Sequence, residues 1–268
     1  MRSFRDLFGP AKAIIGVVHL PPLPGFDGHP GVDAVVRHAL ADLEVLMDCK
    51  VDGVLVENEH DKPHQVRATP AVIAAMKDIT AAVVRESRNI VVGCEILLND
   101  PRASLEVAAH AGAAFIRSDY FVDRMSRPGY GEFEIDAAGL VAYRNESAPG
   151  VLILADVQVK YASMLEPRPL ADSVREAMRS GADAVVVTGD ATGDAPRREH
   201  LDEAARAASS GSSPIPVLIG SGLDPRNAAD LLQRCNGAIV GTALMRNGQI
   251  DTAKTTALMN EVRGTAKP

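Results

Sequence analysis

Eight short apolar runs, rich in β-branched residues, recur along the chain and constrain its fold more than any other feature. Each run is followed by turn-forming residues and then by the apolar spacing of a helix. Continuous rather than alternating apolarity is typical of parallel strands that are covered on both faces. The runs cover residues 14–18, 53–56, 90–94, 114–117, 151–155, 184–187, 216–219 and 238–240. They predict an α/β fold, a TIM-type (β/α)8 barrel, and leave a doubly wound open sheet as the alternative.

The length and composition of the chain fit one such barrel. A length of 268 residues suits a single (β/α)8 domain, and no stretch rich in proline, serine or glycine divides it. A hydrophobic content of 46% allows a large buried core. We therefore expect residues 1–268 to form one barrel domain.

Charge and hydropathy exclude several classes of partner. A net charge of −7, an aromatic content of 4% and the absence of tryptophan argue against nucleic-acid binding. The apolar runs are far shorter than the roughly 20 residues that span a bilayer, and the first residues lack a signal-type apolar stretch. We expect no transmembrane segment and a cytoplasmic location. The three cysteines are widely spaced in apolar contexts and are predicted to be core residues.

Two helix features are predicted in more detail. The segment 33–49 carries an apolar stripe at helical spacing, which we expect to pack on the barrel. The stripe consists of Val36, Leu40, Leu43 and Met47. Asp–Pro pairs at 100–101 and 224–225 are typical of an N-cap followed by a first-turn proline, so helices are predicted to begin there.

In a barrel, ligands meet the loops at the carboxyl ends of the strands, and the residues there are polar in this chain. Acidic residues follow the second, third, fourth and fifth runs, and a histidine follows the first. These candidate catalytic residues are Glu57, Glu95, Asp119, Asp156 and His19. The carboxylates are typical of a general acid–base pair. Alternatively, a divalent metal ion binds to ligands from the second, third and fourth strands, namely Glu57, His60, Asp61, His64, Glu95 and Asp119. His19 is either a catalytic group or a hydrogen-bonded packing histidine.

A phosphate-sized anion pocket is predicted after the last two runs. Glycine lets backbone N–H groups approach a phosphate closely, and barrels often bind phosphate with these two loops. The predicted phosphate-binding residues are Gly189, Gly220, Ser221, Gly222, Gly241 and Thr242. The barrel would then be of the phosphate-binding type, with a small phosphorylated metabolite as its partner.

A second polar constellation follows the fifth run. If that strand continues, Asp156, Gln158 and Lys160 point in the same direction and line one side of the mouth. Lys160 is then either a charged electrostatic group, or, when desolvated, a base or Schiff-base nucleophile; a surface lysine is the alternative. The predicted substrate contacts are Asn58, Arg117, Gln158 and Thr188.

Two long loops border the predicted mouth. The segment 20–25 is rich in proline, and the segment 120–136 contains a mobile-looking glycine–proline stretch. Loops of this length are often lids, and a surface excursion or an oligomer contact is the alternative. We expect a homo-oligomer.

Several of these segments together resemble the BtpA/SgcQ family. The matching segments are 16–25, 52–58, 99–100, 153–160, 187–193 and 220–222. The resemblance implies a TIM-like barrel related to phosphate-binding barrels. It also implies site residues at His19, Glu57, Asn58, Asp156 and Lys160.

The chain departs from that family pattern at Glu95 and Asp119, where relatives tend to have asparagine, and in the polar loop 59–64. The added negative charge favours a metal ion or a cationic transition state. In the family, cyanobacterial members resemble photosystem I biogenesis factors, and other bacterial members are associated with sugar or nucleoside metabolism.

The resulting hypothesis is an enzyme acting on a phosphorylated sugar or nucleoside-derived molecule as a lyase, an isomerase or a glycosidic-bond-cleaving enzyme. No cofactor is predicted for this enzyme other than the divalent metal ion of the alternative described above. The alternative is a non-enzymatic biogenesis factor.

Overall fold

Eight parallel strands close into a barrel in the computed structural model, which describes residues 2–211 and 213–264. The barrel strands are β1 (Ala13–His19), β2 (Gly53–Glu57), β3 (Val91–Glu95), β4 (Phe115–Ser118), β7 (Leu152–Val157), β9 (Ala184–Val187), β10 (Val217–Ile219) and β11 (Gly237–Val240). The ring closes because β1 pairs with β2 on one side and with β11 on the other. The predicted (β/α)8 barrel is therefore confirmed, and each predicted run becomes one strand.

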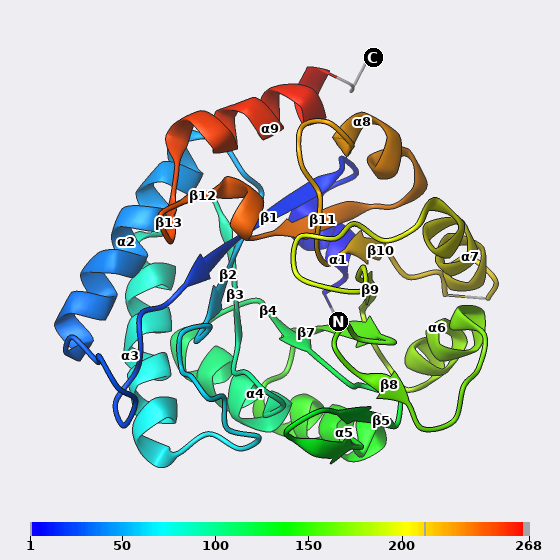
Figure 1. Ribbon diagram of the computed structural model, residues 1–268, viewed down its shortest axis with the longest axis horizontal. Helices are drawn as coiled ribbons and strands as arrows, with labels where there is room; N and C mark the ends of the chain where they lie inside the picture. The colour runs from blue at the N-terminus through cyan, green and yellow to red at the C-terminus, as the bar shows by residue number, and fades with distance from the viewer. Residues whose placement is uncertain (1, 212, 265–268) are drawn as a thin grey trace.

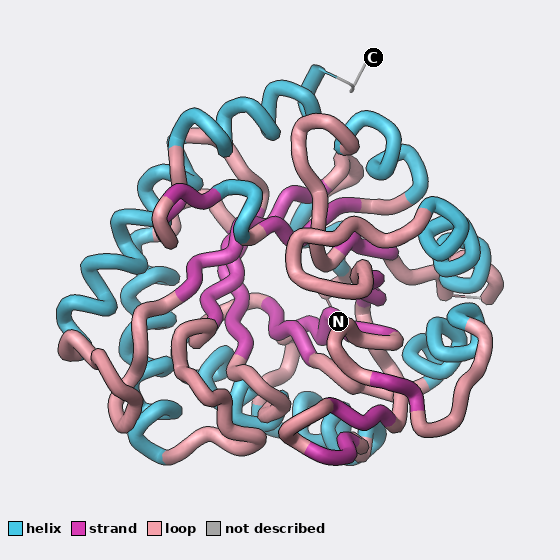
Figure 2. Tube along the Cα trace, in the orientation of Figure 1, coloured by secondary structure: helices cyan, strands magenta, loops and turns pink. Residues whose placement is uncertain are grey.

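Helices surround the strand ring, as Figures 1 and 2 show. They are α2 (Val32–Asp48), α3 (Pro70–Glu86), α4 (Pro101–Ala111), α5 (Ala137–Ser147), α6 (Leu170–Arg179), α7 (Arg198–Ala208), α8 (Ala228–Leu231) and α9 (Thr252–Gly264), with 3-10 turns η1 (Leu232–Arg234) and η2 (Thr242–Leu244) and the hairpin β12 (Met245–Arg246) and β13 (Gln249–Ile250). No helix within the described ranges is long and apolar enough to cross a membrane.

Side chains alternate between two cores along each barrel strand. In β1, Ile14 and Val18 pack in the layer between strands and helices, whereas Ile15 and Val17 pack inside the barrel. This alternation follows from the two-residue period of a strand. The inner core is closed at the amino ends of the strands by α1 (Phe4–Phe8), which lies within the outline of the ring in Figure 1.

The same alternation makes the uppermost inward layer polar. His19 has the parity of Val17, and Glu57 has the parity of Leu55, so both face the interior at the carboxyl ends of their strands. The corresponding residues of the eight strands, in chain order, are His19, Glu57, Glu95, Arg117, Asp156, Thr188, Gly220 and Gly241. Local strand geometry thus places the polar side chains at one end of a barrel whose other interior layers are apolar.

A small antiparallel sheet stands beside the mouth. It consists of β5 (Met125–Arg127), β6 (Gly131–Phe133) and β8 (Ser163–Met164) in the order β6-β5-β8. Tyr120 stacks on Phe133 with ring centroids 4.3 Å apart, and both side chains are buried. The segment 120–136 therefore contains two strands that the sequence pattern did not predict.

Some helix details differ from expectation. In α2 the fully buried apolar residues are Val35, Ala39, Leu43 and Leu46. The predicted stripe packs against the core, but only Leu43 of its members is fully buried. Val36 and Met47 are only half-buried, because α2 also packs against α3 and α9 and its buried face is rotated from the one expected.

The first predicted Asp–Pro helix start is confirmed, because Asp100 caps α4 by accepting from the N–H of Ala103. The second is wrong. Asp224 accepts from the N–H of Arg226 in a local turn, and α8 begins at Ala228. Of the cysteines, Cys94 and Cys235 are buried and Cys49 is half-buried.

Candidate active site

Arg117 lies at the centre of the acidic layer and is buried. Its Nε and Nη2 donate to the two carboxylate oxygens of Asp156, at 2.7 and 3.1 Å. Nη1 lies 3.6 Å from Glu57 Oε1, and Nε lies 3.9 Å from Glu95 Oε2. The guanidinium of Arg117 thus lies among these carboxylates, in a position that a metal ion could otherwise take. Among the described residues, no group of three or more His, Cys, Asp or Glu side chains has the arrangement of a metal site.

Burial shifts the proton equilibria of this cluster. Desolvation raises the pKa of Glu95 well above its ordinary value, despite the opposing charge of Arg117. Asp119 follows β4, and desolvation together with the neighbouring Asp156 carboxylate raises its pKa to about 7. Burial alone would lower the pKa of Arg117, but the charges of Asp156 and Glu95 raise it, so the guanidinium stays charged. The cluster can therefore hold a proton near neutral pH.

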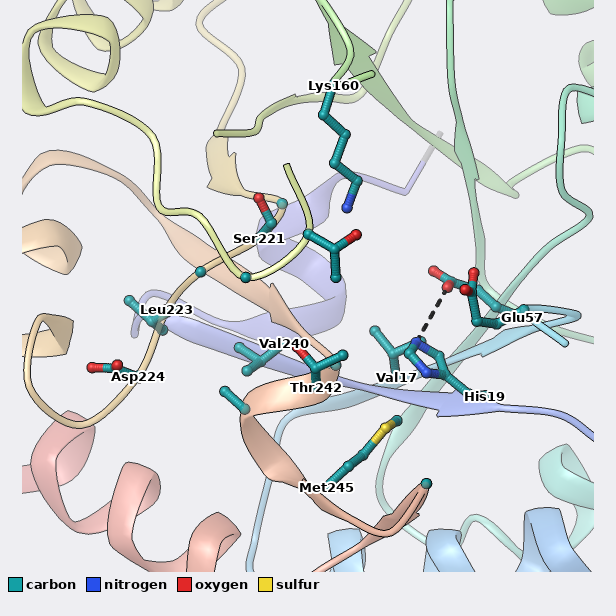
Figure 3. Close-up of a pocket in the computed structure, with 18 of the residues that line it drawn as sticks. Val17, His19, Glu57, Lys160, Ser221, Leu223, Asp224, Val240, Thr242 and Met245 are labelled. Carbon is teal, nitrogen blue, oxygen red and sulfur yellow. Dashed lines mark ion pairs between the residues drawn. The ribbon is translucent and has the colours of Figure 1, made fainter. Parts of the chain in front are cut away.

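His19 faces the cluster from β1. Its Nε2 lies 3.8 Å from Glu57 Oε2, the contact drawn as a dashed line in Figure 3. A Cβ atom at Gly241 would lie 3.2 Å from the same nitrogen, so the glycine leaves room for the imidazole. His19 is thus placed between the acidic cluster and the end of β11.

A cavity of about 550 Å³ opens over these groups. This volume lies in the range of sites for small metabolites. Its wall includes His19, Glu57 and Arg117 on one side and the loops after β10 and β11 on the other. Lys160 projects into it between Ser221 and Glu57 (Figure 3). Most of the predicted site is therefore one continuous space.

The loops after β10 and β11 present backbone donors to this cavity. Within the described part of the chain, no acceptor is found for the N–H groups of Ser221, Gly222, Thr242 and Ala243. Gly222 has φ +72°, and a Cβ there would lie 2.1 Å from the backbone nitrogen of Ala195. A Cβ at Gly220 would lie 2.5 Å from Val186 Cγ1 and 3.2 Å from Arg117 Nη2. Glycine is thus required at both positions, and the donors lie beside the charged cluster.

Two polar groups of the predicted anion pocket are already used inside the protein. The N–H of Gly189 donates to Ser221 Oγ at 3.2 Å, and that hydroxyl donates to the carbonyl of Asp194. These bonds tie the loop after β9 to the loop after β10. The donors that face the cavity are thus mainly backbone N–H groups, and Thr242 is exposed on its wall.

A second chamber of about 300 Å³ adjoins the first. The two share Glu57, Arg117 and Lys160, among other residues. Its own wall adds Glu95, Asp119, Lys62, His64 and Arg127. Lys62 donates to His64 Nε2, and burial lowers the pKa of His64 to about 4, so this imidazole is neutral.

Three predicted substrate contacts do not reach either of these chambers. The amide of Asn58 bonds to Asp61 and to the backbone of Leu97, so it holds loops together. Gln158 has φ +49° and its amide donates to the carbonyl of Arg168 and to Ser173. Thr188 lines a separate polar cavity between the loops after β9 and β10.

The predicted common direction of Asp156, Gln158 and Lys160 is wrong, because β7 ends at Val157 and the chain turns there. Lys160 still reaches the mouth, by a different path. The segment 20–25 is also tied down: Leu23 is buried, and its N–H donates to Asp61 at 2.7 Å. Both carboxylate oxygens of Asp61 therefore accept hydrogen bonds within the protein, one from Leu23 and one from Asn58.

Several cavity residues had no role in the sequence prediction. Thr192 and Gly193 come from the loop after β9, and Glu59 from the loop after β2. Arg127 comes from β5. They lie several residues beyond the strand ends, where local pattern does not indicate direction. Thr192 and Gly193 lie in the segment 187–193 that resembles the BtpA/SgcQ family, and the other two lie in polar loops that follow strands.

Comparisons with known proteins agree with this architecture. The model of the BtpA family matches residues 10–264. Photosystem I biogenesis protein BtpA of Synechocystis sp. is 39% identical over 246 residues, which cover 90% of this chain and 83% of that protein.

Two solved structures from Pyrococcus furiosus share the fold at low identity. N-(5'-phosphoribosyl)anthranilate isomerase superposes with a TM-score of 0.60 at 14% identity, covering 94% of this chain and 99% of that one. Thiamine phosphate pyrophosphorylase superposes with a TM-score of 0.56 at 18% identity, covering 96% and 98%. At such identities the similarity concerns the barrel alone.

Proposed function

This chain belongs to the BtpA family, and we propose that it is an enzyme that acts on a phosphorylated sugar or nucleoside-derived molecule by general acid–base chemistry. The observation that carries this proposal is one cavity with two chemically different ends. Unpaired backbone donors lie at one end, and titratable groups around Arg117 lie at the other. The first suits a phosphate, and the second suits proton transfer.

The phosphate end is built as anion sites commonly are. Consecutive N–H groups at the start of η2 and in the loop after β10 have positive partial charge and belong to residues that line the cavity. The hydroxyl of Ser221 accepts from the N–H of Gly189 and donates to the carbonyl of Asp194, so it holds the loop after β10 against the loop after β9. Phosphate bound here would leave the rest of a small substrate over His19 and the carboxylates.

The acid–base end supplies two proton carriers. Asp119, with a pKa of about 7, is protonated in part at neutral pH and is suited to donate a proton to a leaving or carbonyl oxygen. His19, beside Glu57, is suited to remove one. Lys160 adds a positive charge where an oxyanion or enolate would develop. Isomerisation, lyase chemistry and glycosidic-bond cleavage all use this set.

Substitution at Thr242 tests the phosphate end. Thr242→Glu places a carboxylate among the backbone donors and should abolish binding of inorganic phosphate and ribose 5-phosphate. Thr242→Gln has the same size without the charge and should retain most binding. Thermal unfolding is the measurement, because a ligand at about 100 times its Kd stabilises the folded state by about 2.7 kcal/mol.

The wild type should therefore show a Tm increase with both compounds, Thr242→Gln a similar one and Thr242→Glu none. Equal increases for all three proteins would place the anion elsewhere. No increase in the wild type would remove the phosphate from the proposal.

A non-enzymatic assembly factor is the second candidate, and the 39% identity to a photosystem I biogenesis protein favours it. Such a factor need not bind small anions in the mouth. Stabilisation by phosphosugars, together with turnover that Asp119→Asn abolishes, would favour the enzyme. Absence of both stabilisation and turnover across phosphosugars and nucleotides would favour the assembly factor.

A further inference from the structure

The second chamber contains cations that the phosphate end does not use. Arg127 lines this chamber from β5, and Lys160 stands between the two chambers. In the chain from residue 2 to 211 and from 213 to 264, no carboxylate lies within ion-pair distance of either side chain. Two half-buried cations without a carboxylate partner therefore face the same enclosed space.

Two aromatic rings restrict the position of the Arg127 side chain. Its guanidinium carbon lies 5.4 Å from the ring centroid of Tyr130 and 5.5 Å from that of Tyr161. The hydroxyl of Tyr161 accepts from the N–H of Thr192 at 2.6 Å, which fixes that ring over the mouth. A cation positioned by aromatic faces loses less conformational freedom when a ligand binds.

Three carboxylates of this chamber lie near a cation, although Glu57 Oε1 and Glu95 Oε2 have no hydrogen-bond partner among the described residues. Glu57 and Glu95 lie against Arg117, and Glu59 accepts from Lys62 at 2.8 Å. Asp119 faces Asp156 and holds its proton up to near neutral pH. Within the described part of the chain, Arg127 and Lys160 are therefore the positively charged side chains of this chamber that are not used in an ion pair with a carboxylate.

We propose that this chamber binds a second anionic group of the substrate, a carboxylate or a phosphate, through Arg127 and Lys160. The substrate is then a phosphorylated compound with an anion at each end, and its reacting carbons lie between them, over Arg117 and the carboxylates. This inference rests on the proposed function, because the first anion occupies the loops after β10 and β11.

Calorimetric titration with three compounds tests the inference. Ribose 5-phosphate carries one anionic group, whereas 6-phosphogluconate adds a carboxylate and fructose 1,6-bisphosphate adds a phosphate. We expect at least one of the two doubly anionic compounds to bind the wild type about 10- to 100-fold more tightly than ribose 5-phosphate, as a charged hydrogen bond allows. The compound whose affinity exceeds that of ribose 5-phosphate then shows whether the second group is a carboxylate or a phosphate.

Arg127→Gln should remove that gain and leave the affinity for ribose 5-phosphate unchanged. Arg124→Gln is the matched control: it removes the same charge at the residue just before β5 begins, but Arg124 is exposed and pairs with Glu134 and Glu166. It should keep the gain. Thr242→Glu should weaken all three compounds.

If the wild type binds all three compounds with equal affinity, the second anion site is wrong. It is also wrong if Arg127→Gln retains the higher affinity for a doubly anionic compound. Neither result would contradict the proposed phosphate site. Absence of binding of all three to the wild type overturns the phosphate end and this inference with it.

Discussion

Arg117 sets the electrostatic character of the barrel mouth. Four acidic side chains at the strand ends suggest a metal-binding site when only the sequence is considered. The bidentate pair with Asp156 and the contacts to Glu57 and Glu95 place an internal cation against three of them. Because a buried charge without a partner is very costly, removing Arg117 would disturb the whole layer rather than one contact.

Asp119→Asn tests the raised pKa at that residue. A carboxyl group whose folded-state pKa lies above the unfolded value destabilises the protein fully above the folded pKa, and this effect fades as pH falls toward the unfolded pKa. The variant should therefore be more stable than the wild type at pH 8, by about 1 to 3 kcal/mol, and the difference should shrink by pH 5. Urea unfolding at both pH values measures it.

A stability difference between the variant and the wild type that does not depend on pH would contradict a raised pKa of Asp119. With a phosphorylated substrate, the same variant should lose about 100- to 10,000-fold in kcat, as expected for a general acid. Its thermal stabilisation by inorganic phosphate should match that of the wild type, because the anion end lies on other loops.

At the scale of elements, the small sheet β6-β5-β8 determines how the mouth is covered. It holds Arg127 over the second chamber and packs its own buried cluster on the barrel rim. That cluster contains Leu98, Tyr120, Met125, Phe133 and Val159. A cover with a core of its own is expected to open as a unit rather than to fray residue by residue.

Phe133→Ala should loosen this cover selectively. The ring is buried and stacks on Tyr120, so its loss should cost about 3 kcal/mol locally. Hydrogen exchange should become faster in residues 120–135 and 161–165, with little change in the barrel strands. Glu132→Ala, at an exposed position of the same strand, is the control and should leave exchange unchanged. Faster exchange throughout the barrel would show that the sheet is not a separate unit.

At the scale of the whole molecule, the inner core at the closed end of the barrel is expected to contribute to the stability of the fold. Phe115 is fully buried inside the ring, and its ring contacts Phe8 of α1 with centroids 5.9 Å apart. A Cβ at Gly93 would lie 2.3 Å from the Phe115 ring, so the glycine makes space for it. One aromatic side chain thus joins α1 and the inner core.

Phe115→Ala should therefore lower the global free energy of unfolding by about 3 to 5 kcal/mol. Phe115→Leu, which refills part of the space, should lower it by clearly less. Urea unfolding followed by far-UV circular dichroism provides the measurement. A loss below about 1 kcal/mol for the alanine variant would mean that the inner core does not depend on this ring.

Local pattern was sufficient for the strands and for much of the site. Continuous apolar runs predicted all eight strands, because burial on both faces selects such runs directly. Residues at the strand ends, such as His19, Glu57 and Arg117, then had to lie together once the barrel closed. The inward positions can even be read from the two-residue alternation along each run.

Tertiary structure alone decided the pairing and direction of the remaining groups. That Arg117 neutralises Asp156 depends on the register of neighbouring strands, and that Gln158 turns away depends on where β7 ends. The buried face of α2 depends on its helix neighbours, and Arg127 enters the mouth only because β5 pairs with β6 and β8. Periodicity describes a segment with respect to itself, whereas these features depend on distances between segments that are far apart in the chain.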